Sequence, residues 1–158
     1  MTLTSNFRSF RSDAAGVLRS AQAGQLALLR LVFFQALGDA QTLSPVNTGR
    51  YRASHQFSRA SPNLSQPPEF AGASRQQGVG DPRYARLASE ALARAESIFE
   101  TLRPGNLGSP VFFVSSNLSY SSDIEDGTSA QAPEGVYALT RERALRNFQA
   151  EAARLIRP

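Results

Sequence analysis

The chain has 158 residues and contains no cysteine, no lysine and no tryptophan, and its single histidine is His55. Without cysteine it forms neither disulfides nor thiolate metal sites, which fits a reducing compartment. The longest apolar run, Leu26 to Phe34, is interrupted by Arg30 and is too short to cross a bilayer. The N-terminus lacks the charged start and apolar stretch of a signal peptide. We therefore expect no export and no membrane partner.

The charge of the chain is basic and is carried by arginine alone. Its 17 basic residues are all arginine, and with 13 acidic residues they give a formal net charge of +4. Such a charge suggests nucleic acid or an acidic protein surface as a partner. The arginines are spread along the chain and do not cluster, so a basic nucleic-acid-binding adaptor stays an alternative function.

The first half of the chain is predicted to contain a long helix, a strand and a loop. Apolar residues at spacings of three, four or seven predict a helix over 5–42. Gly24 within it is expected to be either a kink or a small-residue contact. Pro45 is expected to end the helix. Residues 50–58 alternate as a strand does, and 60–80 are rich in Ser, Pro, Gln and Gly, which predicts a flexible loop or insertion with little capacity to pack. The helical stripe comprises Phe7, Phe10, Ala14, Val17, Ala21, Leu28, Val32, Ala36 and Ala40.

The second half is predicted to contain two helices and one strand. Asp81 caps a helix over 81–105 that Pro104 and Gly105 stop, 110–116 form a central strand, and 136–157 form the closing helix. The result is a single α+β domain over 1–158: a long N-terminal helix, a small, mostly antiparallel sheet, and a middle and a C-terminal helix packed on it. The expected apolar faces are Tyr84, Leu87, Ala91, Ala95, Ile98 and Leu102 in the middle helix, and Tyr137, Ala144, Phe148, Ala152 and Leu155 in the last.

Few residues are candidates for catalysis. His55 is predicted on the inward strand face with Tyr51, Ala53 and Phe57, as a packed histidine, and no serine lies in a nucleophile-elbow sequence. A hydrolase that uses His55 with an acidic partner stays an alternative. The glycines of "QQGVGDP" lack the lysine of a phosphate-binding loop.

The acidic stretch "YSSDIEDGTSAQAPEG" (120–135) is the remaining candidate. Its carboxylates, Asp123, Glu125 and Asp126, point in different directions on a short helix, and the calcium-loop spacing is absent. We expect a helical turn over 120–126 closed by Gly127 in a left-handed conformation. Thr128, Ser129, Pro133 and Gly135 then fix a loop, which is a good place for a partner to bind. We expect no catalytic residue, no metal and no cofactor.

Two separated stretches resemble one known family. "LSPVNTGRYRAS" (43–54) and "SSNLSYSSDIEDGTSAQAPEGVYALT" (115–140) are similar to the signature of the small neck, or tail-completion, proteins of long-tailed bacteriophages, in the same order and with helices before and after. The matching positions are Pro45, Val46, Thr48, Gly49, Arg50, Tyr120, Glu125, Gly127, Thr128, Gln131, Pro133 and Gly135.

The resemblance implies a structural virion protein at the head–tail junction, made in the host cytoplasm, and not an enzyme. It implies a homo-oligomeric ring, expected to be a hexamer, around the DNA channel. The neighbours would be a head-closure or adaptor ring and a tail terminator or tail tube, and viral DNA would pass without sequence-specific contact. A tail terminator or head-closure protein of the same neck stays an alternative.

Closed rings need one patch of a subunit to meet a different patch of the next. A hypothesis for that contact pairs an arginine surface with the acidic loop of a neighbour. Its candidate residues are Arg50, Arg52, Arg59, Asp123, Glu125 and Asp126.

Overall fold

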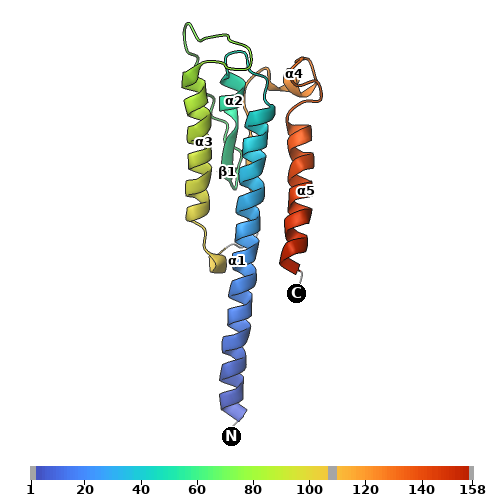
Figure 1. Ribbon diagram of the computed structural model, residues 1–158. Helices are drawn as coiled ribbons and strands as arrows, with labels where there is room; N and C mark the ends of the chain where they lie inside the picture. The colour runs from blue at the N-terminus through green and yellow to red at the C-terminus, as the bar shows by residue number, and fades with distance from the viewer. Residues whose placement is uncertain (1–2, 107–109, 157–158) are drawn as a thin grey trace.

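The computed structural model describes residues 3–106 and 110–156 and gives an elongated, mostly helical α+β protein (Figure 1). The central element is helix α1 (Leu3–Leu43), 41 residues long and therefore about 60 Å. Helices α3 (Pro82–Glu100) and α5 (Tyr137–Ile156) lie on either side of it. The remaining elements are α2 (Arg50–Ser54), β1 (Gln56–Arg59), η1 (Pro104–Asn106), β2 (Phe112–Ser115) and α4 (Ser121–Glu125).

Helix α1 is one unbroken helix that ends at Leu43, as Pro45 predicts. The helix passes through Gly24 without a break, and Leu155 Cδ2 lies 3.8 Å from the position that a Cβ of this glycine would take. Gly24 is therefore the small-residue contact of the two alternatives. The predicted stripe positions Phe7 and Phe10 lie outside the residues whose side chains are described.

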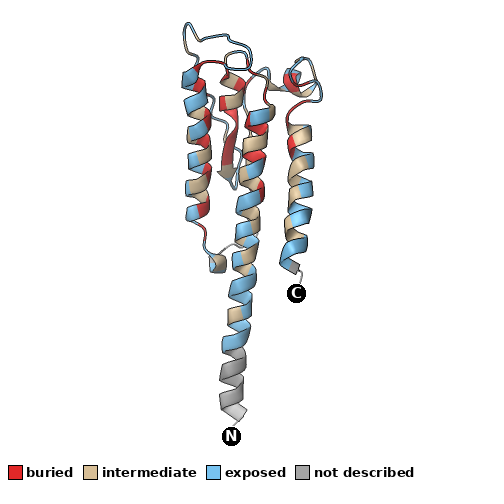
Figure 2. Ribbon diagram, viewed as in Figure 1, coloured by how far each residue is buried: buried red, intermediate tan, exposed pale blue. Residues whose placement is uncertain are grey.

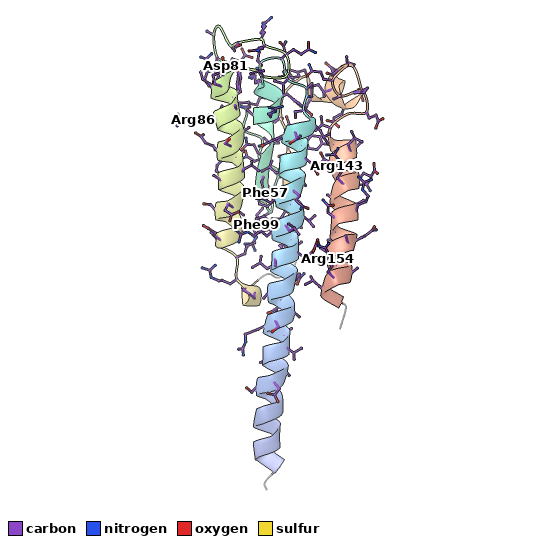
Figure 3. All side chains as sticks on the ribbon, viewed as in Figure 1. Phe57, Asp81, Arg86, Phe99, Arg143 and Arg154 are labelled. Atoms are coloured by element: carbon purple, nitrogen blue, oxygen red, sulfur yellow. The ribbon has the colours of Figure 1, made fainter. Side chains whose placement is uncertain are left out.

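The sheet has two antiparallel strands, with Phe57 opposite Val114 and Arg59 opposite Phe112. The prediction of an antiparallel sheet is confirmed. A sheet of two strands has no central strand, so that part of the prediction for 110–116 is wrong. Aromatic side chains from both strands join those of α1 and α3: the Phe57 ring stacks on Phe99 at 5.1 Å and on Phe112 at 5.4 Å. Figure 3 shows Phe57 and Phe99 in this core beside α1.

The predicted strand over 50–58 is wrong in its first half. Gly49, with φ +92°, turns the chain, and the Ala53 amide donates to the Gly49 carbonyl at 3.0 Å, which closes a helical turn. Residues 50–54 therefore form α2, and the strand begins only at Gln56. Tyr51, Ala53, His55 and Phe57 are all buried as predicted, but Ser54 and Gln56 between them are buried too. The buried residues thus do not alternate, because this segment is enclosed on more than one side.

Helix α3 begins as predicted and ends earlier. The Asp81 carboxylate accepts from the Arg83 amide, and Pro82 takes the first helical position. The helix ends at Glu100, where the Thr101 amide bonds back to the Ile98 carbonyl, and Pro104 and Gly105 belong to the separate turn η1. Its buried face is Tyr84, Ala88, Ala91, Ala95 and Phe99, which replaces the predicted Leu87 and Ile98 by neighbouring residues.

Helix α5 packs on α1 by a narrower face than predicted. Ion pairing of Arg143 with Asp39 at 3.2 Å and a hydrogen bond of Asn147 with Gln35 at 3.0 Å join the two helices. Phe148 is exposed, so its predicted place on the inward face is wrong, whereas Leu155 is exposed over much of its surface but contacts α1 at Gly24. Figure 2 shows α5 at the edge of the molecule beside α1, the helix on which it packs, so that much of its surface faces solvent.

The segment 60–80 has no helix or strand, as predicted, and side chains of α2 and α3 form hydrogen bonds with its backbone. Arg50 donates to the Pro67 carbonyl at 3.2 and 3.3 Å. The Tyr84 hydroxyl donates to the Pro68 carbonyl at 3.0 Å and accepts from the Phe70 amide at 3.2 Å. Most residues of the segment are nevertheless exposed, so the expectation of little capacity to pack is confirmed. Its flexibility stays a prediction.

By length and composition alone, the Ser12–Leu43 part of α1 could cross a membrane, with a mean hydropathy of 1.2 over its most apolar window. The sequence-based argument from the shorter run Leu26–Phe34 did not anticipate this. A third of that window is buried inside the protein (33%). The buried residues include Leu37 and Ala40, which belong to the two clusters of the core. Core helices of soluble proteins satisfy the same criterion.

Candidate functional site

The two signature segments, which lie far apart in the sequence, meet at the end of the molecule opposite the N-terminus. Gln131 Oε1 accepts from the Val46 amide at 3.0 Å. The Tyr51 hydroxyl donates to Glu125 Oε1 at 2.9 Å. We call the unit formed by residues 45–51 and 120–136 the motif junction. Beneath it lies a small core of its own: Ala40, Tyr51, Leu118, Ile124, Ala132 and Val136.

Glu125 is the centre of the motif junction. Besides the Tyr51 hydroxyl, its carboxylate accepts from the Val136 amide at 3.1 and 3.2 Å and from the Tyr137 amide at 2.8 Å. These two amides stand at the start of α5, where backbone donors have no partner within the helix. An anionic side chain there also opposes the positive end of the helix dipole. Burial and the bond to Glu125 together raise the pKa of the Tyr51 hydroxyl far above its usual value, so the tyrosine stays protonated and keeps donating.

The loop after α4 has the predicted geometry. Helix α4 covers Ser121–Glu125, and Gly127 follows with φ +77°. A Cβ on Gly127 would clash with the Pro133 carbonyl, and one on Gly135 would stand 2.9 Å from the Glu125 carbonyl oxygen. Thr128 Oγ1 donates to the Asp123 carbonyl at 2.6 Å, as predicted for a hydroxyl that satisfies local backbone groups.

The first signature segment is held as tightly. Val46 is buried, and the Thr48 hydroxyl accepts from the Arg50 amide at 3.2 Å. The Thr48 carbonyl accepts from the Asp81 amide at 2.7 Å, which ties the segment to the cap of α3. Pro45 and Asn47 line the surface above it. The segment is therefore held by its own Thr48–Arg50 bond, by Gln131 and by the start of α3.

Two adjoining hollows open on the motif junction. One of about 260 Å³ lies between the signature segments, and one of about 360 Å³ extends toward the 60–80 segment. Both are lined by Thr48, Arg50 and Tyr120. The Tyr120 ring lies over Tyr51 at 6.3 Å, and burial raises the pKa of its hydroxyl. This end of the protein thus presents a fixed, polar and uneven surface.

The structure separates the candidate subunit contacts into two groups. Arg50 pairs with Glu69 within the subunit, Arg52 donates to the Gln41 carbonyl at 3.0 Å, and Glu125 bonds as described above. Arg59, Asp123 and Asp126 have exposed side chains. The side chains of Arg59, Asp123 and Asp126 can therefore contact a neighbouring subunit without first breaking a bond within their own chain.

His55 lies outside the motif surface, in a buried chain of hydrogen bonds. Its Nε2 is 2.6 Å from Ser44 Oγ and its Nδ1 is 2.9 Å from the Tyr137 hydroxyl. Since the Ser44 proton goes to the Ala40 carbonyl at 2.6 Å, the arrangement that satisfies all three contacts has Nε2–H donating to Ser44 and Nδ1 accepting from Tyr137. Burial lowers the pKa of His55 to about 3.

Ser44 and His55 do not have the geometry of nucleophilic catalysis. A base must accept the proton of its nucleophile, whereas here the imidazole donates to the serine. His55 is 0% exposed and Ser44 is 5% exposed, so a substrate has no access to either side chain. Neither partner of His55 is acidic, so the histidine–acid pair of the hydrolase alternative is not formed. Within residues 3–106 and 110–156, no group of three acidic or histidine side chains is placed to hold a metal ion.

The sequence singled out the two segments of the motif junction, but it predicted neither that they meet nor what Glu125 does there. No pattern in the sequence pairs Tyr51 with Glu125 or Val46 with Gln131, because these contacts exist only after the two segments have been brought together. Comparison with known proteins adds nothing to this description: no protein-family model, curated protein or solved structure matches the chain.

Proposed function

We propose that this chain is a structural protein of the bacteriophage virion, a neck or tail-completion protein that forms a homo-oligomeric ring and joins the tail to the head around the DNA channel. The observation that carries the proposal is the motif junction. The two segments that resemble the family signature are bonded to each other through Val46–Gln131 and Tyr51–Glu125. A pair of motifs that forms one unit in space is better support than two independent short resemblances.

The character of the surface also supports assembly over chemistry. The motif junction is held together by glycines at positive φ, a half-buried acid at a helix start and a core of its own. The one histidine is enclosed and neutral. A polar surface that is already held in place fits docking onto a neighbouring ring, because little conformational entropy is lost when it binds.

The test is the position of the protein in particles. Antibodies against the chain, imaged by electron microscopy on virions of the phage that encodes it, should label the junction of head and tail. Deleting the gene should leave filled heads and finished tails unjoined, and the wild-type gene supplied in trans should restore joined particles. Label on the capsid shell or tail tip, or normal particles without the protein, would refute the proposal.

A further inference from the structure

Within the part of α1 whose side chains are described, residues 12–22 are mostly exposed. Helix α5 ends near Gly24, where Leu155 contacts it, and residues 12–22 extend beyond the rest of the molecule (Figure 1). We call residues 12–22 the protruding segment. It carries two large apolar side chains in solvent, Val17 at 71% and Leu18 at 58% exposure.

The protruding segment is a poor helix by itself. Gly16, Ser12 and Ser20 all favour helix less than alanine does, and helices in proteins gain most of their stability by packing an apolar face. A Cβ on Gly16 would meet nothing within 4 Å, so no contact within the subunit requires glycine there. A second helix or surface packed closely against this segment would account both for its helical state and for its small residues.

A groove of matching size lies further along the same helix. It has a volume of about 430 Å³ and runs between α1 and the end of α3, with Leu26, Ala27, Leu31 and Phe99 among its lining residues. On α1 it extends from Ala23 to Phe34, which is about 17 Å, and the protruding segment is about 15 Å long. At its rim Arg30 pairs with Glu96, and both side chains are partly exposed.

We propose that the protruding segment of one copy lies in this groove of a second copy. The inference rests on the proposed ring and names the contact that builds it. Val17 and Leu18 would exchange water for contact with Leu26, Ala27 and Leu31, which favours association.

The charges are compatible with a second copy and disfavour DNA or a bilayer as the occupant. The protruding segment holds one acid and one base, Asp13 and Arg19, and the groove rim holds one of each, so two copies meet without net repulsion. A segment without net positive charge has no preference for DNA. The charges and the polar side chains of Ser12, Ser20 and Gln22 also make burial in a bilayer unfavourable.

Segment and groove are different patches of the same subunit. When one copy fills the groove of the next, its own groove stays open to a third copy. Such head-to-tail contacts close into a ring when the rotation permits, whereas a self-complementary patch stops at a dimer.

Because the chain contains no cysteine, paired cysteines test this contact directly. In Val17→Cys/Leu31→Cys the two thiols lie 14 residues apart on one unbroken helix, about 21 Å, and a disulfide needs Cα atoms within about 7 Å. Every disulfide between them therefore joins two copies. Mild oxidation of the full chain should give a ladder of linked species larger than dimers. Each single variant alone should give dimers at most.

Circular dichroism checks that the double variant is folded. If the folded double variant stays monomeric on oxidation, the inference is overturned. A ladder that stops at dimers would overturn the head-to-tail arrangement.

A second measurement uses Val17→Glu and Leu18→Glu, which keep a good helix former in place. Light scattering should show a lower mass for both variants than for the wild type. We expect their self-association to be at least tenfold weaker. Leu64→Glu, an equally exposed leucine in the 60–80 segment, should leave the mass unchanged. Unchanged mass in the α1 variants would overturn the inference. So would loss of binding to phosphatidylglycerol vesicles without any change in mass, since it would assign the segment to a membrane.

These outcomes are separable from the failure of the proposed function. Linked ladders together with antibody label away from the head–tail junction would keep the subunit contact and reject the neck protein. Label at the junction without any ladder would keep the neck protein and reject this contact.

Discussion

At the scale of the residue, Glu125 shows how an acid in a conspicuous cluster serves the fold. Its carboxylate joins Tyr51 of α2 to the first amides of α5 and leaves Asp123 and Asp126 on the surface. Three neighbouring carboxylates thus have two different roles, decided by what surrounds each one. The difference can be measured because Glu125 and Asp126 are adjacent and have the same charge.

Replacing Glu125 by glutamine is expected to destabilise the protein by about 1–3 kcal/mol. The amide removes the negative charge from the start of α5 and turns one acceptor into a donor that faces backbone N–H groups. Asp126→Asn, at an exposed site, should change the free energy of unfolding by less than about 0.5 kcal/mol. Urea unfolding of both variants measures this, and equal effects would contradict the role of Glu125.

His55 predicts a pH dependence of stability. Its pKa is about 3 in the folded protein and about 6.5 in the unfolded chain, so the unfolded state binds the proton more readily. The contribution of His55 is complete above about pH 6.5 and is lost as the pH falls toward 3, by up to about 1.4 kcal/mol per pH unit.

The measurement compares urea unfolding at pH 7.5 and pH 5 for the wild type and His55→Gln. The variant should lose less stability between the two pH values, because glutamine does not titrate. Asp81, whose pKa the Arg83 guanidinium holds well below its usual range, affects stability only below about pH 4 and stays out of this window. Equal losses in both proteins would contradict the assignment.

At the scale of the element, the loop after α4 and the helix α1 use glycine for different reasons. Gly127 has φ +77° and no room for a Cβ next to the Pro133 carbonyl, whereas Gly38 lies inside α1 with nothing within 4 Å of a Cβ. The first glycine is required by its backbone conformation, and the second lowers the stability of a helix that would accept alanine.

Alanine substitutions at these two positions should therefore have opposite signs. Gly127→Ala should destabilise by about 1–3 kcal/mol through strain and the clash, and Gly38→Ala should stabilise by about 0.5–1 kcal/mol. Thermal unfolding followed by circular dichroism measures both. A neutral Gly127→Ala would mean that the loop is free to move away from Pro133.

At the scale of the whole molecule, nearly half of the arginines are paired with acids. Eight of the 17 arginines form ion pairs within the described residues: Arg30, Arg50, Arg83, Arg86, Arg94, Arg143, Arg146 and Arg154. Pairs such as Arg146–Glu142 place an acid beside the base, so the paired arginines add little to the local positive field at the surface.

We therefore expect weak binding to duplex DNA. Filter binding should detect little retention at 50 mM salt and none at 200 mM, because few phosphates are neutralised at once. A Glu142→Gln/Glu151→Gln variant, which frees Arg146 and Arg154, should bind more tightly than the wild type. Tight wild-type binding with a steep salt dependence would favour the alternative of a nucleic-acid-binding adaptor.

The sequence by itself determined the local features of this protein. Periodicity predicted α1, α3 and α5, because a helix buries residues three and four apart. Pro45 marked the end of α1, Asp81 the cap of α3 and Gly127 the turn after α4. These residues act through their own backbone or a neighbouring amide, so the sequence alone reveals them. The α+β class and the antiparallel pairing followed from the order of these elements.

Only the tertiary structure decided what lies between them. Residues 50–54 became α2 because Gly49 turns them and the surrounding elements enclose them. Phe148 stayed exposed because α5 stands at the edge of the molecule, where much of its surface faces solvent. Glu125 found Tyr51 because two segments with no local relation in the sequence meet on a shared core. A contact between distant residues depends on the position of every element between them, and no local pattern encodes that.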